Sequence, residues 1–344
     1  MGLGSNHTTT TVADKWIPDM WEDNIVATYR GASVMRNIVE VNQHGKNKGD
    51  VIHRPNPARG TASAKAANTA VTFTADTAGE ITISIDKHYY HARFYERIAE
   101  YLALSSMMPF YTKDAGQALA ERIDAELHKI MATMQGGSIA GATNLFEKGV
   151  IGGDGSTNFS GASGGNGTAL TDAGLRRAIQ TLEDSNVNLM ECNFVVPPVV
   201  GNSLRSISRY TEQAFIGNGD AIKTGIVARL YGVDVLQSSL CPWIHCNSVT
   251  NTQSVTFTST APTGAAFVDE FGLTVDWNTS SPTDTKYRAC ALVHKDAIAL
   301  YEAGKINVNH EYQATYIGTA VVSDAIFGCG EVRDYGAISI IVPA

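Results

Sequence analysis

The segment from Lys113 to Met134, KDAGQALAERIDAELHKIMATM, is the longest helical pattern in the chain and decides the prediction of the fold. Its apolar residues recur at three- or four-residue steps and fall on one face: Leu119, Ile123, Leu127, Ile130 and Met134. The other face is charged, and Arg122 and Glu126 lie one turn apart, where they can pair. Pro109 before the segment and the glycines at 136–137 after it stop both ends. The apolar stripe needs a long partner, and the flanking sequence predicts a sheet.

The composition bounds the class of protein. The chain has 344 residues, of which 44% are apolar and 17% charged, and its formal net charge is −8. This length predicts two or more lobes around a sizeable core. The low charged fraction is typical of a protein whose surface is buried against copies of itself, although an ordinary enzyme shares it. The acidic balance argues against a protein that grips nucleic acid through broad basic patches.

The cysteines and the hydropathy pattern indicate a reducing compartment and no membrane. The cysteines are odd in number and form no C-x-x-C, so we expect free, mostly buried thiols. They are Cys192, Cys241, Cys246, Cys290 and Cys329. Residues 1–12 are polar, so we expect no signal peptide. No run of about 18 apolar residues occurs, so we expect no membrane-spanning helix.

The N-terminal third predicts an arm followed by a two-stranded ribbon. Trp16 and Trp21 need burial, either on their own domain or across a neighbouring subunit. Residues 42–70 are polar and rich in Gly and Pro, which excludes a helix. Val71–Phe73 and Ile81–Ile85 alternate as strands do. A ribbon with so little apolar content is marginally stable alone, so we expect it to lie on another surface.

Strands and helices alternate in the rest of the chain. After Asp86 we expect a strand with Tyr89, His91, Arg93 and Tyr95 on one face and His88 on the other, which argues against a metal site. Residues 97–104 read as a helix. The glycine-rich run up to residue 168 lacks the Lys-Ser/Thr ending of a phosphate loop and reads as a connector.

Further along, a compact lobe of mixed structure is predicted. Thr171 caps a helix, residues 193–196 form a strand, and the prolines at 197–198 open another helix through residue 207. Gly232 is a turn between two short strands. The polar residues 247–288 read as a hairpin insertion. From residue 289 onward the pattern is nearly all strand, and these strands are the expected bed for the long helix.

Motifs of catalysis are missing from the sequence. It has no G-x-S-x-G, H-E-x-x-H, Walker loop or post-strand G-x-G-x-x-G. Cys241, His245 and Cys246 lack a fourth zinc ligand. We therefore expect no catalytic, metal or cofactor site and no enzyme, although distant residues could still converge on a triad.

The order of the parts resembles the major capsid protein of tailed bacteriophages, which has the Hong Kong-type shell fold. The resemblance covers residues 16–342. Its core is the strand EITISIDKHYYHARFYERIAEYL followed by the helix AGQALAERIDAEL. The segments NFVVPPVVGNSLRSI, GIVARLYGVDVLQSSLCP and ALVHKDAIALYE are similar to later steps of the same family. Each motif is weak alone, whereas their order is specific.

The resemblance implies an α+β fold with five parts. These are an N-terminal arm (1–37), an extended β-hairpin loop (38–85), a peripheral domain (86–140) with its spine helix at 113–134 on an antiparallel sheet, an axial domain (141–298) of mixed sheet and flanking helices with the insertion 247–288, and return strands (299–344). Such chains tile through pentamers and hexamers into an icosahedral shell that encloses double-stranded DNA.

The resemblance also implies contacts and partners. Residues expected to contact other subunits are Trp16, Trp21, Tyr29, Arg36, Lys46, Lys48, Arg54, Arg59, Lys65, Arg122, Glu126, Arg205, Arg209 and Glu212. We expect copies of the chain, a separate scaffolding protein and a portal at one vertex as partners, with room for a decoration or cement protein. DNA contact is expected to be weak and non-specific, and no covalent cross-link is expected. The location implied is the virion capsid, assembled in the host bacterial cytoplasm.

Two alternatives stay open from the sequence. A bacterial encapsulin-type nanocompartment shell shares the fold and would hold a cargo enzyme instead of DNA. A soluble small-molecule enzyme would need a deep pocket with convergent polar groups.

Overall fold

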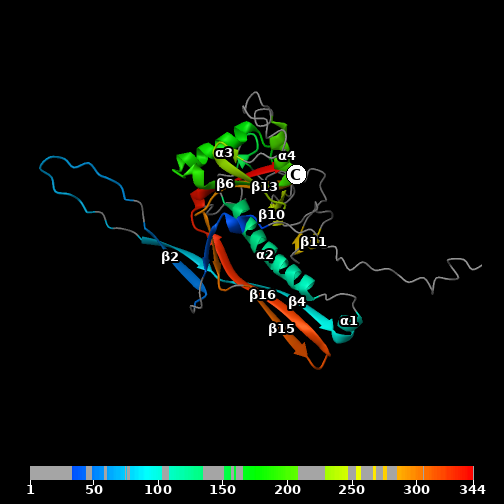
Figure 1. The fold of residues 1–344 in the computed structure, drawn as a ribbon. Coiled ribbons are helices and arrows are strands. Elements are labelled where there is room, and N and C mark those ends of the chain that lie inside the picture. Colours follow the sequence, from blue (N-terminus) through cyan, green and yellow to red (C-terminus); the bar gives the residue numbers. More distant parts are fainter. Residues whose placement is uncertain are drawn as a thin grey trace, which may run out of the picture.

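Two lobes and a projecting ribbon make up the fold (Figure 1). The computed structural model describes residues 33–43, 49–57, 60–73, 75, 78–102, 108–134, 151–155, 159, 166–207, 229–246, 253–256, 266–268, 274–276, 285–304 and 306–343. Each lobe is built on its own sheet, and helix α2 (Met108–Thr133) packs against both sheets. The predicted α+β class is confirmed.

The peripheral lobe is a five-stranded sheet built around one long strand, β16 (Gly318–Glu331). β16 pairs antiparallel with three strands: β4 (Lys87–Glu96) pairs with its residues 318–327, β15 (Asn307–Gln313) with 318–324, and β14 (Ile298–Glu302) with 327–331. β1 (Glu40–Gln43) adds a parallel edge to β14. The side chains of β16 alternate between buried and more exposed positions, so one sheet face packs on α2 and the other faces outward.

The axial lobe is an eight-stranded mixed sheet. Its strands are β5 (Ile151–Gly152), β6 (Cys192–Val196), β7 (Arg229–Leu230), β8 (Val233–Gln237), β9 (Trp243–Cys246), β10 (Gln253–Thr256), β13 (Thr285–His294) and β17 (Ala337–Pro343). β13 lies at the centre, paired antiparallel with β17 and with both β6 and β9. β6 and β8 are parallel. The returning C-terminal strand β17 therefore completes the axial sheet, while β14, β15 and β16 belong to the peripheral sheet.

The two helices of the axial lobe begin where the sequence predicts. The Thr171 hydroxyl accepts a hydrogen bond from the Gly174 amide at 3.2 Å and caps α3 (Asp172–Asp184). The apolar face of α3 is buried, at Leu175, Ala178, Ile179 and Leu182. α4 (Pro198–Ser206) opens with proline in its first turn, where no amide proton is needed, and ends one residue earlier than predicted.

The turn at Gly232 is confirmed, whereas the bounds of the predicted insertion are wrong. Tyr231 and Gly232 both have positive φ, +51° and +88°, which a two-residue hairpin between β7 and β8 requires. The insertion predicted to reach residue 288 must end before Thr285, because β13 begins there in the middle of the axial sheet. The short strands β11 (Ala266–Val268) and β12 (Thr274–Asp276) pair antiparallel within it.

Helix α2 begins five residues earlier than the predicted segment. Pro109 is its second residue and does not stop it, because a proline in the first turn leaves no hydrogen bond unmade. The apolar stripe is buried as predicted, for example at Leu127. It shares one core cluster with Val293 of the axial sheet and Phe327 of the peripheral sheet. The helix is thus the common core element of both lobes.

Several charged side chains of α2 are buried, whereas Glu121 is half-buried and Lys129 is exposed. Asp124 and His128 are fully buried, and Arg122 and Glu126 are each only 8% exposed. The cause is β4, which lies over this side of the helix, together with the chain segment that precedes β1. Figure 1 shows β4 running beside α2 toward the far end of the peripheral lobe. Helical periodicity alone does not reveal a second covering layer.

The ribbon consists of β2 (Val51–Pro57) and β3 (Ala78–Ser84), paired antiparallel as predicted. Its base lies on β16, where a side chain at Gly328 would come within 2.3 Å of the Ser84 carbonyl oxygen, so only glycine permits this approach. Farther out, the chain between β2 and β3 leaves the body (Figure 1). Val71–Phe73 is not a strand, contrary to prediction, and both residues are exposed.

Shorter helical elements complete the described chain: η2 (Met35–Asn37), α1 (Arg97–Leu102), η4 (Leu189–Glu191) and η5 (Asp334–Gly336). α1 confirms the helix predicted after residue 97. None of the helices in the described ranges has the length and apolar character needed to span a membrane.

Asp124 fixes the start of the described chain to the spine helix. Its two carboxylate oxygens accept hydrogen bonds from the Ser33 hydroxyl at 3.2 Å and from the amides of Val34 and Arg36, both at 3.1 Å. The Nδ1 of His128 donates to the Asp124 carbonyl oxygen at 2.8 Å and lies 3.4 Å from the carboxylate. This buried carboxylate therefore holds residues 33–36 on the spine helix.

We predict that Asp124→Asn lowers the free energy of unfolding by about 3 kcal/mol, because the amide turns a donor toward the amide protons that the carboxylate accepts. Urea denaturation monitored by circular dichroism measures the change. Asp234→Asn is the matched control, because Asp234 pairs with Arg229 at 3.0 Å on an exposed surface and should cost less than about 1 kcal/mol. Equal losses for the two variants would contradict the assigned role of Asp124.

The burial of His128 leads us to expect that the fold loses stability in acid. Burial lowers the pKa of His128 below its ordinary value of 6.5, despite the opposing effect of Asp124. Below pH 6.5 the unfolded chain therefore binds a proton that the folded chain resists, so stability falls as the pH drops. Comparing the unfolding free energy of wild type and His128→Gln from pH 7.5 to 5 checks this. The wild type should lose more stability over this range, and parallel pH profiles would refute the claim.

Candidate functional site

The residues predicted to contact other subunits fall into three groups. Eight of them lie outside the described residues: Trp16, Trp21, Tyr29, Lys46, Lys48, Arg59, Arg209 and Glu212. Four are exposed or half-buried at the ends and edges of elements, and two are buried in the chain. The exposed or half-buried residues are Arg36, Arg54, Lys65 and Arg205, and the buried ones are Arg122 and Glu126.

Arg36 lies at the root of the arm and is held by the peripheral sheet. Its Nε and Nη2 donate to the two carboxylate oxygens of Glu302, on β14, at 2.9 and 3.1 Å. The hydrogen bond to Glu302 raises the pKa of Arg36 above its ordinary value, against the opposing effect of burial. A bidentate pair of this kind fixes orientation as well as distance. Together with Asp124, it fixes residues 33–36 on the body.

Arg54 fixes the ribbon base in a similar way. Its Nη1 donates to Glu40 of β1 at 2.8 Å, and Glu40 also accepts from the Asn42 amide group at 2.9 Å. Burial raises the pKa of Glu40, but the hydrogen bonds from Asn42 and Arg54 outweigh it, so the pKa lies below the ordinary value. Lys65, in contrast, is exposed in the chain beyond β2, and Arg205 is exposed near the end of α4.

Arg122 and Glu126, which the sequence analysis placed among the intersubunit contacts, are buried within the chain. Arg122 Nη2 lies 2.9 Å from Glu126, which confirms the predicted pair. The Tyr89 hydroxyl donates to Glu126 at 3.1 Å and accepts from Arg122 at 2.9 Å, and the guanidinium lies 4.4 Å from the centre of the Tyr89 ring. These contacts fix β4 on α2 and bury both charges within the chain. We therefore remove the two residues from the set of proposed contacts.

The outward face of the peripheral sheet carries an apolar patch beside polar residues such as the hydrogen-bonded His88 and Asp324. We call it the outer sheet face, and its exposed large side chains are Tyr90, Phe94, Tyr316, Val322 and Ile326. Tyr90 is 72% exposed although it lies in the middle of a strand. Exposed apolar patches of this kind on a soluble chain mark interaction sites. This is the strongest indication of a binding surface in the described chain.

The outer sheet face contains an apolar recess of about 490 Å³. Ala92 and Phe94 of β4 lie opposite Val322 and Ala320 of β16, and all four line the recess. Tyr316, in the turn between β15 and β16, closes one end, with its ring edge-on to Phe94 at 6.1 Å between centroids. The sequence contains a signal for this surface, because aromatic residues occur on both faces of β4, as expected of a strand covered on both sides.

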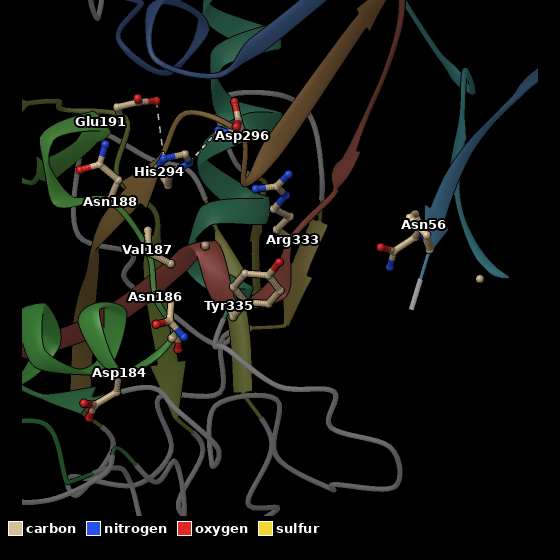
Figure 2. A pocket seen from close by; sticks show the side chains of 14 residues that line it. Asn56, Asp184, Asn186, Val187, Asn188, Glu191, His294, Asp296, Arg333 and Tyr335 are labelled. Carbon is tan, nitrogen blue, oxygen red and sulfur yellow. Dashed lines mark hydrogen bonds and ion pairs between the residues drawn. The ribbon is translucent and has the colours of Figure 1, made fainter. Parts of the chain in front are cut away.

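A second, larger recess separates the outer end of the paired ribbon strands from the axial lobe. Its volume is about 1350 Å³. Figure 2 shows Asn56 on the ribbon, apart from the other labelled side chains, and Glu191 beside His294. Glu191 ion-pairs with Lys295 and lies 3.8 Å from His294. The recess is polar and wide, unlike a ligand pocket that encloses a small molecule.

The residue types of a catalytic triad meet in this recess without the geometry of one. The Ser185 hydroxyl donates to the Thr181 carbonyl oxygen at 3.0 Å. The Nδ1 of His294 accepts from the Asp296 backbone amide at 3.2 Å, which leaves the Asp296 carboxylate out of the bond. A nucleophile, a base and an orienting carboxylate must be joined by hydrogen bonds to act together. These bonds direct Ser185 and His294 to backbone groups instead.

The described cysteines are free thiols, as predicted. Cys192, Cys241 and Cys290 are buried, and Cys329 is partly exposed. Burial raises the pKa of Cys192 to about 11 and that of Cys241 to about 12, so these thiols stay protonated. Among the residues described, no three metal-ligating side chains come together.

Comparison with sequence families and with curated proteins finds no match. Comparison with solved structures, in contrast, finds similar chains. The chain is similar to the capsid structure of the cyanophage P-SCSP1u, with 18% identity and a TM-score of 0.66, covering 99% of this chain and 97% of that one. It is similar to the mature capsid of bacteriophage PhiM1, with 14% identity and a TM-score of 0.66, over 95% and 92% of the two chains.

A third similar structure is the acid-stable capsid of Helicobacter pylori bacteriophage KHP30. Its identity to this chain is 12% and its TM-score 0.64, over the full length of both chains. These likenesses run from end to end, so they include both lobes and the ribbon together. The chain therefore has the fold of the phage capsid structures, as the order of its sequence elements predicts.

Proposed function

We propose that the chain is the major capsid protein of a tailed double-stranded DNA phage, which assembles through pentamers and hexamers into an icosahedral head. The end-to-end likeness to phage capsid structures carries the proposal. The apolar patch on the outer sheet face supports it independently, because an isolated soluble chain has no use for such a surface. The role is structural. The recess in Figure 2 does not support the enzyme alternative, because its Ser185 and His294 side chains hydrogen-bond to backbone groups.

The parts of the chain have distinct roles in this proposal. The arm (1–37) and the extended loop (38–85) reach neighbouring subunits, the spine helix and peripheral sheet (86–140 with 299–331) form the wall, and the axial lobe faces the centre of each capsomer. Arg36 and Arg54 orient the arm and the loop through Glu302 and Glu40. Lys65 and Arg205 are exposed contact residues. Trp16, Trp21, Tyr29, Lys46, Lys48, Arg59, Arg209 and Glu212 stay proposed contacts.

Charge suits the proposed role of the shell as a container. A net charge of −8 gives a wall that repels packaged DNA, so contact with the genome is weak and non-specific. We further propose a separate scaffolding protein, a portal at one vertex, room for a decoration protein, and assembly in the host bacterial cytoplasm. Co-expression with and without the scaffolding protein tests that part separately.

The function predicts concentration-dependent assembly into closed particles. Purified chain, with the scaffolding protein where needed, should elute as capsomers and megadalton shells, and negative-stain images should show icosahedral particles. Copurified double-stranded DNA supports a phage head, whereas a copurified enzyme indicates a nanocompartment. A compact monomer or dimer at every concentration, with or without scaffold, would refute the proposal.

A further inference from the structure

The segment between the ribbon strands carries the most exposed large apolar side chain of the described residues. Phe73 is 94% exposed and Val71 is 63% exposed. The described part of this segment, residues 60–73, has the sequence GTASAKAANTAVTF, with Lys65 as its single charged residue. An exposed phenylalanine of this kind is costly in water and is typical of an anchor that binds elsewhere.

The recess on the outer sheet face has the matching properties. Its walls are mostly apolar, and its volume of about 490 Å³ leaves room for one aromatic side chain. The lining residues are Ala92, Phe94, Tyr316, Ala320 and Val322, together with the polar Arg93 and Gln313. An entering ring would meet Phe94 and Tyr316, which already stand edge-on to each other. Aromatic side chains favour this arrangement, so the recess suits a third ring.

The two surfaces cannot meet within one chain. Figure 1 shows the segment beyond β2 and the turn between β15 and β16 at opposite ends of the molecule. The base of the ribbon is fixed on the body by Arg54 and by the close approach of β3 to Gly328. Any partner for both surfaces that comes from this protein must therefore be a second copy.

We propose that Phe73 of one copy inserts into the recess between β4 and the β15–β16 turn of a second copy, and that this apolar contact, rather than the basic residues of the loop, anchors the loop. The inference rests on the proposed function and assigns the receiving surface to the outer sheet face, not to the spine helix. Because the contact is apolar, its strength should change little with salt.

Photocross-linking tests the contact directly. Phe73 is replaced by p-benzoylphenylalanine, which keeps an aromatic ring at the position, and assembled shells are irradiated. We expect dimers on a denaturing gel, with the adduct mapped to peptides that contain residues 92–94 or 316–322. Adducts confined to the arm, the spine helix or another protein would overturn the proposal, as would intact shells without intersubunit adducts.

Substitutions provide a second readout that needs no cross-link. Phe73→Ser and the recess-filling Ala320→Phe should each raise the protein concentration required for assembly about tenfold or more, with similar shifts at 0.1 and 1 M NaCl. Lys65→Ser tests the alternative that a basic residue of the loop carries the contact, and it should raise the required concentration much less than Phe73→Ser. Thr61→Ala, exposed on the same loop, and Met190→Ser, an exposed apolar position outside the outer sheet face, are the matched controls, and both should assemble near the wild-type concentration.

The outcomes separate the two proposals. If wild-type chain forms no particles under any condition, the proposed function fails. If particles form but Lys65→Ser weakens assembly more than Phe73→Ser, and does so in a salt-dependent way, the function stands and the apolar anchor is wrong. Thermal unfolding of the unassembled variants shows whether a substitution acts on the fold instead, and in that case the mapped adducts decide.

Discussion

The fold depends on one helix that must bury two faces at once. The apolar face of α2 fills the core shared by the axial and peripheral sheets. Part of its charged face is covered by β4 and by the start of the described chain, where Asp124 accepts three hydrogen bonds and Arg122 and Glu126 bind Tyr89. Buried charges left without these partners would cost several kcal/mol each. The polar contacts therefore fix the register of β4 and the arm on the helix.

That register determines which surfaces are left uncovered. Because Tyr89 and its alternate neighbours face α2, the intervening residues of β4 must face outward with their apolar side chains. The ribbon is fixed separately, by Arg54 on Glu40 and by the approach of β3 to Gly328, and it extends away from the body (Figure 1). The exposed apolar segment of the ribbon and the recess on the outer sheet face thus follow from how the ribbon and β4 pack on the body. Each lacks apolar cover within the described chain, and this incompleteness is the physical basis of the proposed assembly.

Local signals predicted local structure well. The cap at Thr171, the turn at Gly232 and the alternation of β4 each depend on a few neighbouring residues, and all three are confirmed. Pro109 misled the prediction of where α2 begins, because proline is tolerated in a first turn. The burial of Arg122 and Glu126 was missed, since it comes from strands distant in sequence. The recess requires two strands and a turn in register, which periodicity alone cannot place.

The central claim is that the ribbon and the outer sheet face find their cover only on other copies. Hydrogen–deuterium exchange of dissociated chain and assembled particles tests it most directly, with the amides of β17 in the axial core as an internal reference. The account predicts that the segment around Phe73 and the turn at Tyr316 exchange rapidly in the dissociated chain and become protected on assembly, while β17 is protected in both. Equal protection of these segments in the isolated chain, or rapid exchange in intact particles, would contradict it.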